Sequence, residues 1–148
     1  MNTGAELIES YLRTRQVRYF RGHHDDEFFF VVGAYHGSVH VHLQPCGPAD
    51  AAVRVSINAQ RYYPAQQRDR VAALVQQWNA TDGQVTATVV ESCDPGLIGV
   101  RAERRYPGTD TDFGPFVDQA VQSAIDLFGR LRTVAAWPSD DARLLDAG

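Results

Sequence analysis

Residues 27–43 read EFFFVVGAYHGSVHVHL and contain two neighbouring strands that determine the fold. Glu27–Val32 carries aromatic and β-branched side chains on both faces, which is typical of a strand covered on both sides. Val39–Leu43 alternates aliphatic residues with histidine, which predicts one face toward the core and one away from it. The segment Gly33–Ser38 between them is short and contains two glycines, so it predicts a turn.

Strand patterns continue on both sides of this pair. Gln16–Arg21 precedes it and Val53–Asn58 follows it, and both have a period of two. Four strands in succession with short connections favour an antiparallel meander. Two later strands, Val85–Val89 and Ile98–Glu103, are joined by the turn residues Asp94–Gly96 and predict a hairpin.

Three segments have helical spacing instead. Ala5–Thr14 has an apolar stripe and is preceded by Thr3, which predicts a capping box. Pro64–Asn79 follows, with Pro64 at the first helical position, where proline is favoured. Phe113–Thr133 has one wide apolar face. The predicted order is therefore α-β-β-β-β-α-β-β-α.

This order predicts an α+β domain in which helices pack on one face of an antiparallel sheet. The other face then either stays in water or meets a partner. We expect one domain over residues 1–136 and a short polar tail over residues 137–148.

Composition excludes several classes of partner. The chain has 148 residues and a net charge of −4, and all 14 basic residues are arginine, so we expect no binding to nucleic acid. No apolar run is long enough to span a bilayer, and the amino terminus lacks the pattern of a signal peptide. We therefore expect a cytoplasmic protein without a membrane partner, in which Cys46 and Cys93 are free thiols.

Four segments together resemble the YbjN family, small bacterial proteins that share the fold of type III secretion chaperones. They are Ile8–Leu12, Phe28–Gly33, Leu74–Asn79 and the late helix through Phe128, and the resemblance covers about residues 5–133. It implies a chaperone-like α+β fold, often dimeric, without established catalytic residues. Members of the family are labelled sensory-transduction regulators, and fold alone is a weak guide to function.

All five histidines lie between positions 23 and 42, and one interpretation of this cluster is a divalent-metal site. His40 and His42 share one strand face, and His36, His24, Asp25 or Asp26 could supply further ligands. The alternative is that His40 and His42 lie on a solvated sheet face. The spacing matches no established metal motif, so we expect no bound metal and no cofactor.

No catalytic constellation is recognisable. The chain lacks a GxSxG elbow, a Walker loop and a GxGxxG turn after a strand. Arg101, Arg104 and Arg105 form a small basic cluster next to Tyr106. Such a cluster could bind nucleic acid, but we favour the interpretation that it is a solvated strand end paired with Glu103. The sequence therefore predicts a protein without enzymatic activity.

Large aromatic residues instead suggest a surface that binds protein. The candidates are Phe29, Tyr62, Tyr63 and Trp78. The leading hypothesis is a chaperone-like or adaptor-like module that binds another protein or itself as a homodimer. The competing hypothesis is a small-ligand or divalent-metal sensor that uses the histidine-rich strand region.

Overall fold

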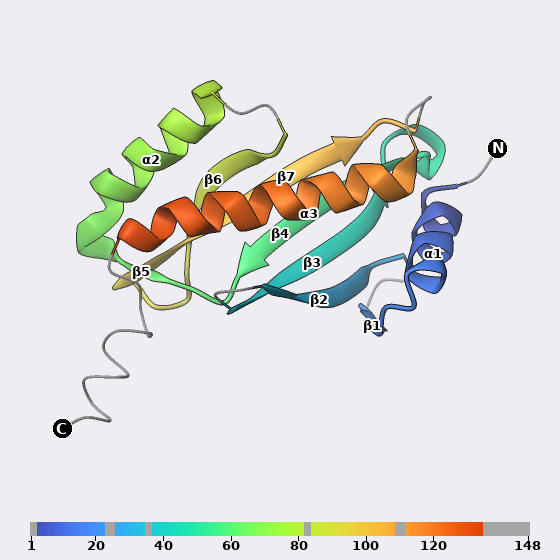
Figure 1. Cartoon of the computed structure of the whole chain (residues 1–148), viewed down its shortest axis with the longest axis horizontal. Helices are drawn as coiled ribbons and strands as arrows, with labels where there is room; N and C mark the ends of the chain where they lie inside the picture. Colours follow the sequence, from blue (N-terminus) through green and yellow to red (C-terminus); the bar gives the residue numbers. More distant parts are fainter. Residues whose placement is uncertain (1–2, 23–25, 35–36, 82–83, 109–111, 135–148) are drawn as a thin grey trace.

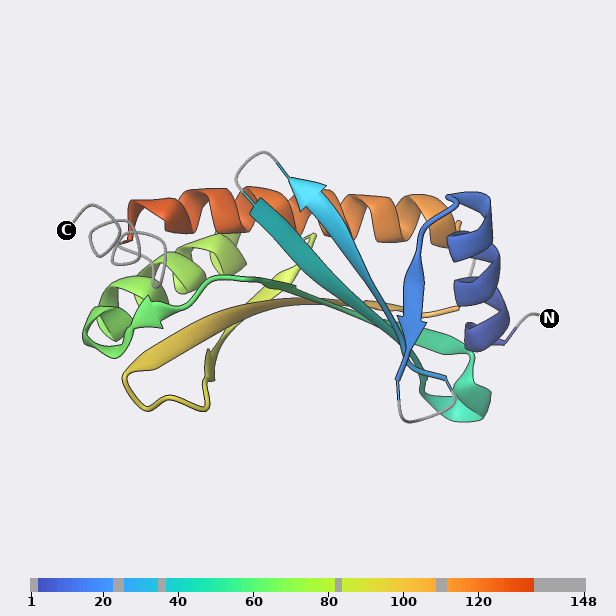
Figure 2. The same ribbon diagram turned by 90° about the horizontal axis from the view of Figure 1, so that it is seen from below.

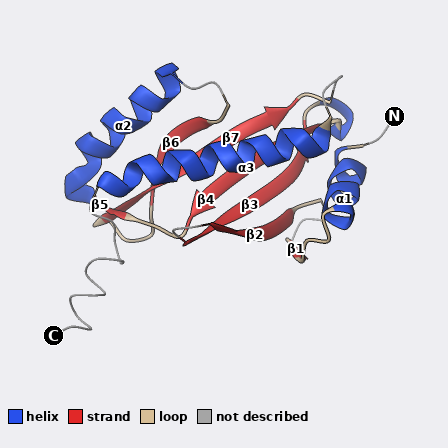
Figure 3. Ribbon diagram, viewed as in Figure 1, coloured by secondary structure: helices blue, strands red, loops and turns tan. Residues whose placement is uncertain are grey.

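The computed structural model describes residues 3–22, 26–34, 37–81, 84–108 and 112–134, which form three α-helices and seven strands (Figure 1, Figure 3). The α-helices are α1 (Gly4–Thr14), α2 (Arg68–Thr81) and α3 (Phe113–Arg130). The strands are β1 (Tyr19–Arg21), β2 (Phe28–Ala34), β3 (Gly37–Cys46), β4 (Ala52–Ala59), β5 (Tyr63–Pro64), β6 (Thr86–Glu91) and β7 (Leu97–Tyr106). Short 3₁₀ turns are η1 (Pro48–Asp50), η2 (Ala65–Gln67) and η3 (Leu131–Thr133).

All seven strands belong to one antiparallel sheet. Strands β1 to β4 are neighbours in chain order, so the predicted meander is confirmed. Strand β7 pairs with β4 through Arg101–Tyr106, with β5 through Leu97 and Ile98, and with β6. The predicted hairpin of β6 and β7 is also confirmed, and the Leu97 amide closes its turn by donating to the Asp94 carbonyl at 3.0 Å.

The helices pack on one face of this sheet, as the sequence predicts (Figure 2). Helix α3 runs along that face, while α1 and α2 lie near its two ends. Strand side chains with a period of two meet the helices and form one core. Its largest fully buried members include Phe28, Ile8, Leu43, Ile57 and Leu127. The fold class is therefore α+β.

Helix α1 begins as expected. Thr3 is the N-cap, its hydroxyl accepts from the Glu6 amide at 3.2 Å, and the Glu6 carboxylate accepts from the Thr3 amide at 3.2 Å. This reciprocal pair is a capping box, which satisfies two amides that the helix leaves without partners. At the other end of the chain, Asp112 is the N-cap of α3, but its side chain makes no capping hydrogen bond.

The prediction that the second helix begins at Pro64 is wrong. Tyr63 and Pro64 form β5 against β7, and the Ala65 amide donates to the Gly96 carbonyl at 2.8 Å. These contacts hold the backbone extended at Pro64, with φ −57° and ψ 137°. The 3₁₀ turn Ala65–Gln67 follows, so α2 begins only at Arg68.

Candidate functional site

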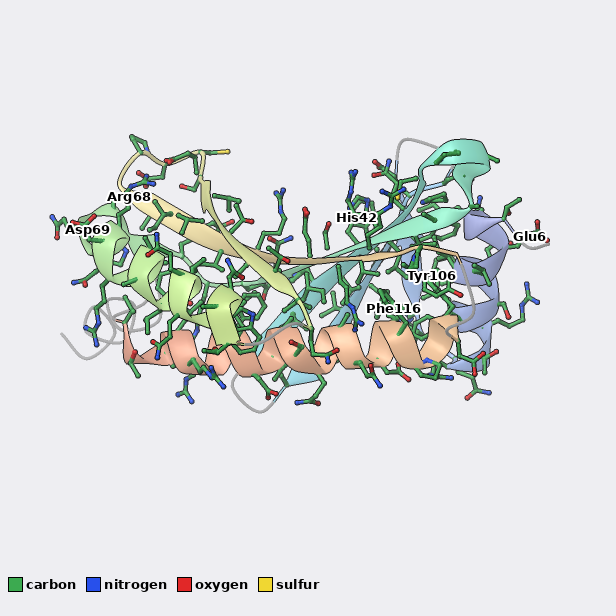
Figure 4. The ribbon with its side chains drawn as sticks, turned by 90° about the horizontal axis from the view of Figure 1, so that it is seen from above. Glu6, His42, Arg68, Asp69, Tyr106 and Phe116 are labelled. Carbon is green, nitrogen blue, oxygen red and sulfur yellow. The ribbon has the colours of Figure 1, made fainter. Side chains whose placement is uncertain are left out.

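The sheet has a second face that the three helices do not cover, here called the open face. Figure 4 shows His42 projecting from the side of the sheet away from α3, whereas Tyr106 and Phe116 lie between the sheet and that helix. Strand residues that alternate with the core positions supply the open face. They include Phe29, Val31, His40, His42, Arg54, Asn58, Arg101, Glu103 and Arg105.

Large apolar side chains gather at one edge of the open face. Phe20 on β1 pairs with Phe29 on β2, and Val31 lies two residues farther along β2 on the same side. Their exposed fractions are 65% for Phe20, 38% for Phe29 and 49% for Val31. These three residues, here called the β1–β2 patch, form a contiguous apolar surface that none of the three described helices covers.

The two strand histidines lie beside this patch. His42 is the cross-strand partner of Phe29, and His40 is the partner of Val31, so the prediction that both histidines share one outward face is confirmed. The rings of Phe29 and His42 are stacked, with centroids 4.5 Å apart and planes at 8°. His40 is exposed, while His42 is half-buried.

Within the described ranges, no group of three or more His, Cys, Asp and Glu side chains could hold a metal ion. Of the other proposed ligands, His36, His24 and Asp25 lie outside those ranges, whereas Asp26 lies within them. Among the described residues, the Nε2 atom of His42 is buried without a hydrogen bond, and Glu27 Oε1 lies 3.9 Å from it. His40 and His42 together therefore provide two imidazoles on one face.

The surroundings of His42 favour its neutral form. Burial beneath Phe29 is the largest cause and lowers the pKa of His42 below its usual 6.5. Glu27 opposes this by raising the pKa, while the positive charges of Arg101 and Arg54 lower it further. The imidazolium form of His42 is thus disfavoured in the folded chain.

This lowered pKa predicts a loss of stability in mild acid. The folded chain binds a proton at this histidine more weakly than the unfolded chain does. The histidine therefore makes its full contribution to the free energy of unfolding above its unfolded pKa, near 6.5. That contribution is lost as the pH falls from 6.5 through the lowered folded pKa. In urea unfolding, the free energy of unfolding should therefore fall more steeply from pH 8 to pH 5 for the wild type than for His42→Gln. Identical pH profiles would contradict the assignment, and His40→Gln is the matched control because His40 is exposed.

The four aromatic residues predicted to contact a partner divide into two pairs. Phe29 and Tyr62 are exposed, and they stay candidates. Tyr63 and Trp78 are each only 1% exposed, so the prediction that they form a binding surface is wrong. Both side chains belong to the core. Tyr63 pairs with the buried residue Ile98 of β7, and Trp78 is one of the buried residues of α2. Burial also raises the pKa of Tyr63 to about 12.

Tyr62 and the β1–β2 patch lie in different parts of the sheet. The ring of Tyr62 lies over Gly99 of β7, where an added Cβ would be 3.7 Å from Tyr62 Cδ1. Strands β3 and β4 separate β7 from β2 in the sheet order. The structure therefore brings Phe29 together with Phe20 and Val31, and not with Tyr62.

Sequence reasoning missed Phe20 and Val31. A signal for Phe20 was present, because the period of two over Gln16–Arg21 puts Val17 and Tyr19 on one side of the strand and Phe20 on the other. Val31 was hidden in the run Phe28–Val32, which is apolar on both faces and gives no hint of which face the helices cover. Only the packing of α3 distinguishes the two faces.

The structure also shows the state of the two predicted free thiols and the contacts of the arginine cluster. Cys46 and Cys93 are both unpaired, as expected. Arg101 Nη1 lies 3.8 Å from Glu103 Oε1, while Arg104 donates to Gln84 and lies over the Phe116 ring, 4.2 Å from its centroid. Arg101 and Arg104 of this cluster are therefore engaged with neighbouring side chains.

None of the described helices is both long enough and apolar enough to cross a membrane.

No protein-family model matches the chain, and no curated protein is significantly similar to it. Solved structures do match. YbjN from E. coli, described as a candidate transcription regulator, has a TM-score of 0.61 and 16% identity, covering 86% of this chain and 91% of its own.

A second solved structure supports the same architecture. An uncharacterized protein from Methanothermobacter thermautotrophicus has a TM-score of 0.54 and 11% identity, covering 88% of this chain and 97% of its own. At such low identity, these matches establish the fold alone. The resemblance to YbjN that the sequence predicts is therefore confirmed, and this chain has the YbjN fold.

Proposed function

We propose that this chain is a non-enzymatic protein-binding module that forms a homodimer through its open face. The observation that carries the proposal is the β1–β2 patch, formed by Phe20, Phe29 and Val31 on the sheet face that the three described helices leave uncovered. Burial of apolar surface contributes about 25 cal/mol per Å², so covering such a patch is favourable. A partner that covers it removes two phenylalanine rings from water.

A second copy of the chain is the partner that the charges favour. Around the patch, the open face carries both signs of charge. Arg54 and Arg101 are positive, and Glu27 and Glu103 are negative. A face of one sign would repel its own copy, whereas a mixed face can pair with itself about a two-fold axis. The apolar patches of the two copies are then both buried in the interface.

A regulatory role fits this proposal. YbjN, which shares the fold, is described as a candidate transcription regulator, and a domain with net charge −4 is poorly suited to phosphate backbones. We therefore propose that the chain acts on other proteins in the cytoplasm as an adaptor rather than by contacting nucleic acid.

The dimer is tested by measuring the mass in solution. Light scattering coupled to size exclusion should give twice the 16.4 kDa mass of one chain for the wild type. Phe20→Glu and Val31→Glu should each shift the protein to monomer, because they place a carboxylate inside an apolar interface. Gln76→Glu on the exposed side of α2 is the matched control and should stay dimeric. A wild-type monomer at high protein concentration would overturn the proposal.

The divalent-metal sensor stays a prediction. Its support is the shared outward face of His40 and His42. A site of three or more protein ligands there would need side chains from outside the described ranges, such as His36.

A further inference from the structure

On the helix side of the sheet, a hollow of about 180 Å³ lies where the β2–β3 hairpin, the end of β4 and the carboxyl-terminal part of α3 meet. Figure 2 shows the β2–β3 hairpin rising toward α3. Val39, Ile125 and Phe128 provide the apolar floor of the hollow. Val39 and Phe128 also belong to the core, so the floor is rigidly packed.

Two glycines keep this hollow open. Gly37 and Gly129 line it, and a Cβ added at either position would meet no atom of the described residues within 4 Å. Gly37 has φ +131°, a conformation that side chains rarely adopt, which explains glycine at that position. Backbone conformation does not explain glycine at position 129, because this residue lies in helix α3, where glycine is about 1 kcal/mol less favourable than alanine. Its effect is to leave space beside Phe128.

The described residues of the hollow give it positive charge. Arg61 and Arg132 line it, and none of the described lining residues is acidic. Within the described part of the chain, neither arginine makes an ion pair, in contrast to Arg15, Arg21 and Arg68. Two guanidinium groups at an apolar hollow are complementary to an anionic group attached to an apolar body.

We propose that this hollow binds a small amphipathic carboxylate. The carboxylate is held by the guanidinium groups of Arg61 and Arg132, which present paired donors that match its two oxygens. The apolar body rests on Val39, Ile125 and Phe128. A dry cavity of about 150 Å³ accepts benzene, so the volume suits a single ring or a short acyl chain rather than a large cofactor.

The inference does not depend on the proposed dimer, because the hollow and the β1–β2 patch lie on opposite faces of the sheet. Octanoate is the probe, and octylamine, with the same tail and the opposite charge, is its matched counterpart. Octanoate should raise the Tm of the full chain in a concentration-dependent way, because a ligand of the native state stabilises it. Octylamine should not.

Three variants define the site. Arg61→Gln and Arg132→Gln should each weaken octanoate binding at least tenfold in calorimetry, as expected for loss of a charged hydrogen bond. Gly129→Leu should remain folded, because its side chain extends into open space, and it should abolish binding by filling the hollow. Arg70→Gln, on the exposed side of α2, and Phe20→Glu, on the open face, should bind octanoate as the wild type does.

Two results would overturn the proposal. The first is no Tm shift with millimolar octanoate, which would mean that the hollow is closed to small carboxylates or filled by the chain itself. The second is a shift that persists in Gly129→Leu or is matched by octylamine, which would place the binding elsewhere. The mass measurements on Phe20→Glu answer the dimer question separately.

Discussion

Replacing Val41 with aspartate is expected to destabilise the fold by about 4 kcal/mol or more, because it leaves a carboxylate unpaired in the core. Val41 is 1% exposed and lies in the middle of β3, between its cross-strand partners Phe30 and Ile57. A domain of this size has a total stability of about 5–15 kcal/mol, so the loss approaches complete unfolding. Urea denaturation at pH 7, followed by circular dichroism, measures it.

The matched control is His40→Asp, one position earlier on the same strand. His40 points to the open face and is exposed, so this substitution should change stability by no more than about 1 kcal/mol. The pH dependence adds a second readout, because burial raises the pKa of an aspartate at position 41 and protonation relieves the penalty. Val41→Asp should therefore become relatively more stable as the pH falls. Equal losses for both variants would show that the two faces of β3 are not distinct.

This pair of residues also shows why the sheet was predictable from sequence. The alternation of Val39, Val41 and Leu43 with His40 and His42 assigns each side chain to a face without knowledge of any neighbour. Capping at Thr3 is similarly local, and it is confirmed. Features that depend on three or four consecutive residues were therefore recoverable.

Features that depend on distant segments were not. Pro64 has the local signal of a helix start, but pairing of Tyr63 with Ile98, 35 positions later, overrides that signal. The hollow beside Phe128 requires the β2–β3 hairpin, β4 and α3 to meet, and no local pattern specifies this. The β1–β2 patch likewise depends on which face of the sheet α3 covers.

Trp78 is the clearest case of a residue whose role changes once its neighbours are known. As an aromatic side chain near a helix end, it was a candidate for partner binding. In the structure its indole N–H donates to the Val85 carbonyl at 3.0 Å, and the Arg130 guanidinium lies 4.8 Å from its ring centroid. Next to it, the Asn79 side chain donates to the Ala87 carbonyl at 2.9 Å and accepts from the Ala87 amide at 2.8 Å. This pair joins the end of α2 to β6.

Trp78→Ala is therefore expected to lower the free energy of unfolding by about 3–5 kcal/mol, through the cavity left by the indole and the loss of its hydrogen bond. Trp78→Phe should cost less, because it retains an aromatic ring and loses mainly the N–H donor. Tyr62→Ala is the control for an exposed aromatic residue and should cost no more than about 1 kcal/mol. If Trp78→Ala instead left stability unchanged and weakened self-association, Trp78 would be a contact residue, and the packing of α2 against β6 would be wrong. The expected loss of stability also means that Trp78 variants cannot be used to map the partner surface, which has to be probed at Phe20 and Val31.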